Sequence, residues 1–262
     1  MNILDKIIVR KREEVALAKE TTSLAELEKF PLFDRKTYSL RESIVDKNRS
    51  GIIAEFKRAS PSKGIINDKS TVKDVARGYE LAGASAISVL TDADFFKGSL
   101  QDLTEARDAV TIPVLRKEFV IDRYQIAEAK AYGADVILLI AAVLSSDEIK
   151  DLSCYAKELG LSVLLEVHNK EELDRSIFDS IDAIGVNNRN LKDFTVSIQH
   201  SLDLVNLIPD SFIKVSESGI SDPESIIELK EAGFQAFLIG ENFMKTDNPQ
   251  EAISSFINQI KA

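Results

Sequence analysis

Eight short runs rich in isoleucine, valine and leucine recur along this 262-residue chain, about one every 20–35 residues. They span residues 52–56, 86–90, 113–116, 136–140, 162–167, 183–186, 212–215 and 236–239. Most are apolar at nearly every position instead of alternating with polar residues. This pattern is typical of strands in a parallel sheet whose two faces are both covered.

The segments between the runs carry helix start and stop signals. Glycine is the usual residue just past a helix C-terminus, and it stands three positions before the start of a run in the stretches 82–90, 132–140 and 232–239. Residue types that favour helix starts occur at Ser70-Thr71, at Ser145 and at Ser221-Asp222-Pro223. Helices are therefore expected between the strands.

Eight strands that alternate with helices predict an α/β protein with a (β/α)8 TIM barrel. We expect one domain over residues 1–262, in which residues 51–262 form the barrel and residues 1–50 a helical N-terminal extension. A doubly wound open sheet is the alternative. It more often has fewer strands, and no G-x-G-x-x-G follows the first run.

The N-terminal extension shows helical spacing of apolar residues over positions 3–20. A second helix is expected over residues 23–30 and should stop at Pro31. Two placements stay open, because spacing alone favours neither. The extension either plugs the bottom of the barrel or covers part of the active-site mouth.

Composition limits the classes of partner. The formal net charge of −10 argues against a general nucleic-acid binder, whereas a small anionic ligand responds only to the local charge of its site. The single cysteine, Cys154, fits a reducing compartment, and the sequence shows neither a signal-peptide pattern nor an apolar run of ~20 residues. We expect a cytoplasmic protein, monomeric or at most a weak dimer, without nucleic-acid or membrane partners.

Polar side chains gather where the runs end. In a barrel of this type the active site lies at the C-terminal ends of the strands. The polar run ends are Glu55 and Lys57, Arg116 to Glu118, Glu166, Asn187 to Arg189, Glu217 to Gly219, and Gly240 with Glu241. Such a ring costs desolvation energy unless its members pair or bind a ligand. Paired lysines and glutamates also shift each other's pKa values toward the range that acid–base catalysis uses.

Two glycine-containing stretches favour a phosphate site, S-E-S-G-I at 216–220 and I-G-E-N-F at 239–243. The loops after the seventh and eighth strands usually bind phosphate in these barrels. The S-P-S-K-G loop at 60–64 adds hydroxyl groups and a second cation, Lys63. The alternative is that both glycines only form turns.

Six motifs follow one another in the order and spacing of the indole-3-glycerol phosphate synthase family, which the chain resembles over nearly its whole length. They are E-F-K-R-A-S-P-S-K-G, S-V-L-T-D-x-x-F-F-x-G-S, L-R-K-x-F, L-L-E-V-H, N-N-R-N-L and S-E-S-G-I. The resemblance implies a (β/α)8 barrel of tryptophan biosynthesis, a carboxy-lyase that uses neither cofactor nor metal. It implies closure of the indole ring of 1-(2-carboxyphenylamino)-1-deoxyribulose 5-phosphate, with loss of carbon dioxide and water.

The resemblance also implies roles for single residues. Lys117 is the implied acid of ring closure, and Lys57 and Glu166 are jointly ranked for the acid of the later loss of hydroxide, with Glu55 holding and tuning Lys57. The implied substrate-binding residues are Asn187, Arg189, Phe119, Glu217 and Leu238. The implied phosphate-binding residues are Ser60, Ser218, Gly219 and Gly240.

Several other residues carry expectations of their own. Glu241 stands beside the expected phosphate site, where many family members have a small hydroxyl residue, so its side chain should point away from the anion. Cys154 is expected to be a buried apolar residue of a helix. His168 is expected to be a structural or rim residue, because no metal-ligand spacing surrounds it. Phe95 and Phe96 fit the core and a substrate-facing position equally well.

Three other functions stay open at this stage. Phosphoribosylanthranilate isomerase shares the barrel and phosphate site, but it needs a Cys and Asp pair at strand ends, and Cys154 lies in an expected helix. A phosphosugar-binding barrel without catalysis is disfavoured because all the acid–base groups are present. The third is a scaffold subunit of a larger complex.

Overall fold

The computed structural model describes residues 3–190 and 195–261, and its eight long strands form a closed parallel barrel. The strands are β1 (Ile52–Phe56), β4 (Ala86–Leu90), β5 (Val114–Lys117), β6 (Val136–Ile140), β7 (Ser162–Val167), β8 (Ala183–Asn187), β9 (Ile213–Glu217) and β10 (Ala236–Ile239). They pair in the order β1-β10-β9-β8-β7-β6-β5-β4, and β4 pairs back to β1. The predicted TIM barrel is confirmed. Two short strands, β2 (Ala59–Ser60) and β3 (Gly64–Ile65), pair in the loop after β1.

Strand boundaries follow the apolar runs closely. Three strands end later than predicted, β5 at Lys117, β8 at Asn187 and β9 at Glu217. The runs are defined by apolar side chains, whereas ladder hydrogen bonds involve only the backbone and continue through polar residues. The late strand ends matter because they fix the direction of the last side chains. In the N-N-R-N-L motif, Leu191 lies outside the described residues.

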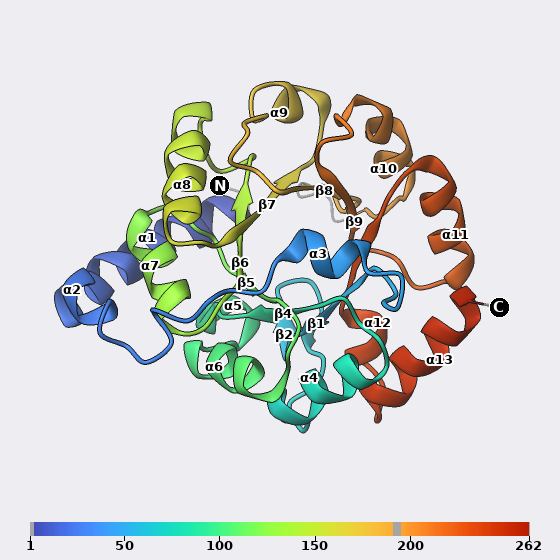
Figure 1. Cartoon of the computed structure of the whole chain (residues 1–262), viewed down its shortest axis with the longest axis horizontal. Coiled ribbons are helices and arrows are strands. Elements are labelled where there is room, and N and C mark those ends of the chain that lie inside the picture. The colour runs from blue at the N-terminus through green and yellow to red at the C-terminus, as the bar shows by residue number, and fades with distance from the viewer. Residues whose placement is uncertain (1–2, 191–194, 262) are drawn as a thin grey trace.

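Helices surround the barrel (Figure 1). The helices after the strands are α4 (Val72–Leu81), α6 (Leu100–Ala109), α7 (Arg123–Ala131), α8 (Ser146–Glu158), α9 (Lys170–Asp174), α10 (Gln199–Leu204), α11 (Pro223–Ala232) and α13 (Pro249–Lys261). Shorter ones are α5 (Ala93–Phe96), η1 (Val205–Leu207) and α12 (Glu241–Met244). Side chains of Thr71, Ser145 and Asp222 cap α4, α8 and α11, as predicted. Within the described ranges, no helix is both long and apolar enough to cross a membrane.

Each strand alternates its side chains between the barrel interior and the helix layer. Ile53, Leu115 and Leu164 belong to the interior apolar cluster. Ile52 and Val163 instead belong to the cluster between strands and helices. This alternation decides which side chains reach the mouth of the barrel, because the same direction recurs every second residue.

Helix α3 (Leu40–Val45) plugs the N-terminal end of the barrel. It lies across the centre of the ring of helices in Figure 1. Leu40 and Ile44 join the interior apolar cluster. The Ser43 hydroxyl donates to the Ser85 carbonyl at 2.5 Å, just before β4. This helix was not predicted from the sequence.

Helix α1 (Ile3–Thr21) lies at the opposite end, beside the C-terminal ends of the strands. Its Arg10 pairs with Asp94 of α5 at 2.8 Å. Its Lys11 pairs with Asp92 and Glu118, which follow β4 and β5, at 2.9 Å each. The two placements left open for the extension therefore both occur, in different helices: α1 covers the mouth and α3 plugs the bottom.

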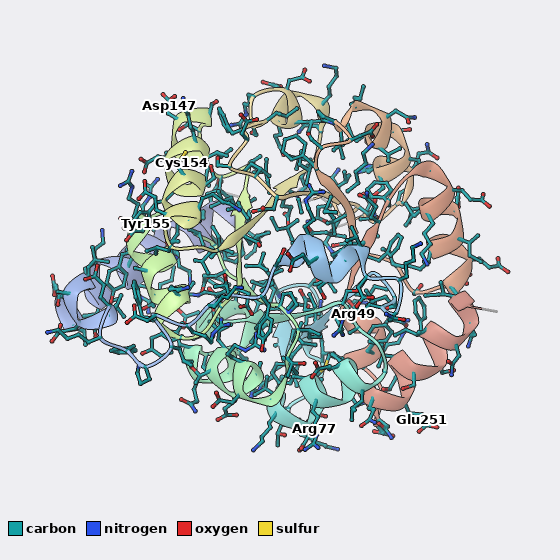
Figure 2. The ribbon with its side chains drawn as sticks, viewed as in Figure 1. Arg49, Arg77, Asp147, Cys154, Tyr155 and Glu251 are labelled. Atoms are coloured by element: carbon teal, nitrogen blue, oxygen red, sulfur yellow. The ribbon has the colours of Figure 1, made fainter. Side chains whose placement is uncertain are left out.

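Two local predictions are wrong. The second helix of the extension is only α2 (Leu24–Leu27), because the chain continues to Phe30 in separate turns. Cys154 is exposed on α8 instead of buried (Figure 2). The buried face of that helix carries Ile149, Leu152 and Ala156, and position 154 falls outside it.

Candidate active site

A cavity of about 820 Å³ opens at the C-terminal end of the barrel. Ile3, Leu4 and Ile7 of α1 form part of its wall. All the site residues expected from the sequence line this one cavity, namely Glu55, Lys57, Ser60, Lys117, Phe119, Glu166, Asn187, Arg189, Glu217, Ser218, Gly219, Leu238 and Gly240. Residues from six strand ends therefore share one hollow.

The barrel register explains which strand-end side chains reach the cavity. Glu55, Lys117 and Glu166 each lie two positions after a residue of the interior cluster, so they keep its inward direction. Arg116 and Asn188 are out of phase by one position, and both are buried away from the cavity. In the sequence Arg116 and Asn188 stand with the others at the run ends, and the alternation of side chains along the strands separates them from the residues of the cavity.

Lys117 is held between two carboxylates. Its Nζ lies 2.7 Å from Glu217 Oε2 and 3.2 Å from Glu166 Oε2. Burial alone would lower the pKa of Lys117, but the charges of Glu217 and Glu166 outweigh burial and raise the pKa above its ordinary value. Lys117 therefore carries a proton at neutral pH, as a general acid must before it acts.

The two carboxylates differ in the direction in which their pKa values are shifted. Burial raises the pKa of Glu217 to about 6, and the neighbouring charge of Glu166 adds to this, against the effect of Lys117. For Glu166, burial is outweighed by Lys117, by His168 and by a hydrogen bond from Asn187, which lower its pKa. The Asn187 Nδ2 donates to Glu166 Oε1 at 3.0 Å. Pairs of groups whose pKa values are pushed apart suit acid–base chemistry, and of these two Glu166 gives up its proton at the lower pH.

Glu55 and Lys57 form a second pair on the inner face of β1, at 2.8 Å between Oε1 and Nζ. Gly240 makes room for this pair. A Cβ atom at position 240 would lie 2.6 Å from Glu55 Oε1 and 2.8 Å from its Cβ, closer than real side chains allow. Only glycine therefore fits at position 240 with Glu55 in place.

We expect a Glu55→Gln variant to fold normally and to lose turnover by roughly tenfold or more, because Lys57 loses the charge that holds it over the cavity. Gln keeps the volume of Glu55 beside Gly240, so the change tests charge and not packing. Steady-state kinetics with a matched thermal melt would check this. Equal kcat values in the variant and the wild type would contradict the role of Glu55 in holding Lys57.

The loop after β9 has an unusual backbone conformation. Ser218 and Gly219 have φ angles of 70° and 72°, in the left-handed region. Turns of this kind can present successive backbone N–H groups to an anion, although a non-glycine residue such as Ser218 pays an energetic penalty there. The Ser60 hydroxyl lies at the same cavity, buried and without a hydrogen-bond partner among the described residues. It is therefore free to donate to a ligand.

Asn188 holds the Ser218 turn in place and was missed as a site residue. Its Nδ2 donates to the Ser218 carbonyl at 3.2 Å and to Ser216 Oγ at 3.0 Å. The Ser201 hydroxyl donates to Asn188 Oδ1 at 2.8 Å. The side chains of Asn188, Ser201 and Ser216 are fully buried, so the protein fixes the strained turn before any ligand binds.

Glu241 also lines the cavity. Its Oε1 lies 3.7 Å from Lys63 Nζ in the loop after β1. The lysine offsets the negative charge that Glu241 brings to this side of the cavity.

The remaining wall is apolar. The rings of Phe96 and Phe119 lie 6.2 Å apart between centroids, tilted by 39°. Leu138, Ile140 and Leu238 complete this side. Of the two phenylalanines left open by the sequence, Phe96 faces the cavity, and this side can hold a flat aromatic ring.

Lys11 is another residue that the sequence analysis missed. It is 3% exposed, and its Nζ contacts Glu14, Asp92 and Glu118 at 2.6, 2.9 and 2.9 Å. The signal was present, because Lys11 stands between Ile7 and Val15 on the buried stripe of α1. A lysine on the apolar stripe of a helix indicates acidic partners elsewhere in the fold, because lysine is almost never buried unless it is paired.

A Lys11→Met variant should loosen α1 and raise KM severalfold, because Asp92 and Glu118 would lose their buried counter-ion at the cavity rim. Limited proteolysis within α1 and steady-state kinetics would measure the two effects. Lys6→Met is the matched control, since Lys6 is exposed on the same helix. If both variants behave alike, the ion-pair cluster does not hold the helix.

No group of three or more His, Cys, Asp or Glu side chains within the described ranges is arranged to hold a metal ion. The two histidines were not expected to bind metal. His168 lies beside Glu166, at 3.3 Å between Nε2 and Oε1, and not at the rim.

Comparison with known proteins gives one family. The family model for indole-3-glycerol phosphate synthase matches residues 4–256. The curated indole-3-glycerol phosphate synthase of Bacteroides thetaiotaomicron is 46% identical over 260 residues, covering 99% of this chain and 99% of the relative. That of Burkholderia ambifaria is 45% identical over 256 residues, covering 97% of this chain and 98% of the relative.

Solved structures with the same fold are far more distant in sequence. A 3-hexulose-6-phosphate synthase from Salmonella typhimurium superposes with a TM-score of 0.61 at 12% identity, over 80% of this chain and 99% of that one. The tryptophan synthase complex of Pyrococcus furiosus gives 0.60 at 17% identity, over 82% and 98%. These likenesses show the barrel fold alone.

Proposed function

Because the chain belongs to the indole-3-glycerol phosphate synthase family, we propose that its cavity closes the indole ring of 1-(2-carboxyphenylamino)-1-deoxyribulose 5-phosphate. The enzyme is a carboxy-lyase of tryptophan biosynthesis, and the reaction releases carbon dioxide and water. One observation carries the assignment of roles: a protonated lysine held by two carboxylates lies in the same cavity as a preformed anion turn.

The substrate is anchored at both ends in this proposal. Its phosphate binds the Ser218–Gly219 turn, Ser60 and the backbone at Gly240, with Lys57 near. Its anthranilate ring lies against Phe119, Phe96 and Leu238. Two anchors hold the ring carbon and the carbonyl carbon close together, which lowers the entropic barrier to forming a bond between them.

Lys117 donates its proton to the carbonyl oxygen as the ring carbon attacks. A positioned acid avoids the build-up of negative charge on that oxygen. The carboxylate then leaves as carbon dioxide, and the electron pair of the broken carbon–carbon bond restores the aromatic ring. Glu217 Oε1 is buried and makes no hydrogen bond to the described residues, so it is available to a substrate hydroxyl.

Dehydration needs both an acid and a base, and Lys57 and Glu166 are the two candidates. The lowered pKa of Glu166 keeps this carboxylate ionised, so we assign it the base, and Lys57 the acid that protonates the leaving hydroxyl. Asn187 orients Glu166, and Arg189 lines the same cavity, where it can contact the substrate carboxylate. A monomeric, cytoplasmic enzyme that works as one domain is part of the same proposal.

Phosphoribosylanthranilate isomerase is disfavoured further by the position of Cys154. That residue is exposed on α8 and does not line the cavity, so it cannot supply the cysteine that the isomerase needs. The decisive experiment is a turnover assay with the anthranilate deoxyribulose phosphate, followed by the fluorescence of the indole product. Product formation by the wild type supports the proposal, and its absence would overturn the assignment of this chemistry.

A further inference from the structure

Gly185 is the middle residue of β8, and it lies on the inner face of the barrel, because Ala183 two positions before it belongs to the interior apolar cluster. Its φ angle lies outside the left-handed region, so the backbone at this position does not require glycine. Glycine inside a strand weakens the strand and often marks a place where another group approaches the backbone closely. The structure shows which group this is.

The carboxylate of Glu217 occupies the space that a side chain at position 185 would need. A Cβ atom there would lie 2.1 Å from Glu217 Oε1 and 3.1 Å from Glu217 Cδ. Real Cβ atoms essentially never come within 3.0 Å of such an atom, so an alanine could enter only if the carboxylate moved. The third near atom, Leu164 Cδ1 at 3.3 Å, ends a flexible side chain and could shift by the few tenths of an ångström required.

The order of the strands explains why this space matters. Strand β8 lies between β7, which carries Glu166, and β9, which carries Glu217. In the ladder of β7 and β8, Gly185 is the partner of Glu166. In the ladder of β8 and β9, the partner of Glu217 is Asn187, one inner-face position further along. The carboxylate of Glu217 therefore extends back over the position without a side chain, toward the level of Glu166.

This direction brings two carboxylates to one ammonium group. Lys117 reaches across from β5, and its Nζ lies 2.7 Å from Glu217 Oε2 and 3.2 Å from Glu166 Oε2. The other oxygen, Glu217 Oε1, fills the space above Gly185 and has no hydrogen-bond partner among the described residues. The space at Gly185, and not a hydrogen bond to Oε1, therefore sets where this end of the carboxylate lies.

We propose that Gly185 is a positioning residue for the acid of ring closure, because the absence of a side chain there lets Glu217 reach Lys117. With a methyl group at position 185, Glu217 would turn aside and Lys117 would keep only its longer contact with Glu166. The ammonium group would then no longer be fixed between two partners. The role of Lys117 as the acid rests on the proposed function, whereas the close approach of Glu217 to Gly185 is independent of it.

The first test is a Gly185→Ala variant. We expect its kcat to fall by roughly tenfold to a hundredfold, because a displacement of about 1 Å in the groups that hold a reacting atom can cost this much. The fluorescence of the indole product measures kcat. The melting temperature should fall as well, because the added methyl group pushes a buried carboxylate away from its counter-ion.

The control is the same change in a Glu217→Ala background, which is itself expected to be slower than the wild type. The carboxylate is absent there, so the added methyl group has room, and Gly185→Ala should change kcat by less than about twofold. Alanine is also more favourable than glycine inside a strand, so the melting temperature should hold or rise in this background. A need for glycine in the strand itself would instead cost the same in both backgrounds.

Equal losses of kcat in the two backgrounds, or a Glu217→Ala variant as fast as the wild type, would overturn the proposal. Should Gly185→Ala fail to fold, the double variant decides: a folded double variant supports the clash with Glu217, and an unfolded one contradicts it. If the wild type itself makes no product, the proposed function falls instead. The melting temperatures of the four proteins then still test the contact between Gly185 and Glu217, so the two failures are distinguishable.

Discussion

A Lys117→Met variant should still bind the substrate but close the ring about 10²–10⁴-fold more slowly than the wild type. Methionine keeps the length of the side chain and removes the proton that Lys117 is held to deliver. The phosphate turn and the aromatic wall are separate from Lys117, so binding should persist. Fluorescence turnover assays and substrate titration of the variant would measure the two quantities independently.

The same variant should change how stability depends on pH. Without the ammonium, Glu166 and Glu217 face each other in a buried site, which raises both pKa values. A buried carboxyl group with a raised pKa destabilises the fold once the pH exceeds its ordinary value near 4.5, and the loss grows until the raised pKa is passed. The melting temperature should therefore drop more at pH 8 than at pH 5.

Lys117→Arg is the matched control, because it keeps the positive charge between the two carboxylates but moves the donor atoms. It should melt closer to the wild type than Lys117→Met while remaining slow. Turnover of the Met variant within a factor of ten of the wild type would refute the role of Lys117 as acid. An equal stability loss at both pH values would contradict the charge argument.

The apolar runs predicted the strands, because strand formation depends on local rules, but they did not predict which strand-end side chains point inward. Glu55, Lys117 and Glu166 continue the inward direction of apolar residues that the sequence already shows. Arg116 is also a cation at a strand end, next to Lys117, yet it points outward and donates to Glu128 of α7 at 2.7 Å. A count of charged strand ends cannot separate the two classes without the register.

The missed residues depend on contacts between distant segments. Lys11 meets Asp92 and Glu118 only because α1 folds over the mouth. Asn188 bonds to Ser216 of β9 and to Ser218 in the loop after that strand. Each is a single polar residue in an otherwise ordinary element, so its partner becomes visible only when the chain is folded.

Asp135 shows the same principle at the other end of the barrel, where the largest loss of stability is expected. This fully buried residue precedes β6 and its carboxylate accepts hydrogen bonds from Arg107, from Arg35 at 2.8 Å, and from the backbone N–H groups of Tyr38 and Val114 at 2.8 Å each. It therefore ties the extension, α6 and β5 together. The sequence pattern around Asp135 predicts only the start of a strand.

Asp135→Ala should lower the free energy of unfolding by about 3–5 kcal/mol, because Arg107 would stay buried without its counter-ion. Burial already lowers the pKa of Arg107 despite the presence of Asp135, which indicates how poorly this site tolerates an unpaired charge. Denaturant unfolding would measure the change. For a chain of this size the melting temperature should fall by about 10 °C or more.

Asp182→Ala is a close structural control for this prediction. Asp182 precedes β8 as Asp135 precedes β6, and its carboxylate likewise accepts the N–H of the preceding strand, from Val163 at 2.8 Å. Its cation is Lys157, whose side chain is 41% exposed and returns to water when the partner is lost. The Asp182 variant should therefore lose only about 1–2 kcal/mol. Equal losses in the two variants would show that the backbone bonds, and not the buried Arg107 charge, dominate at Asp135.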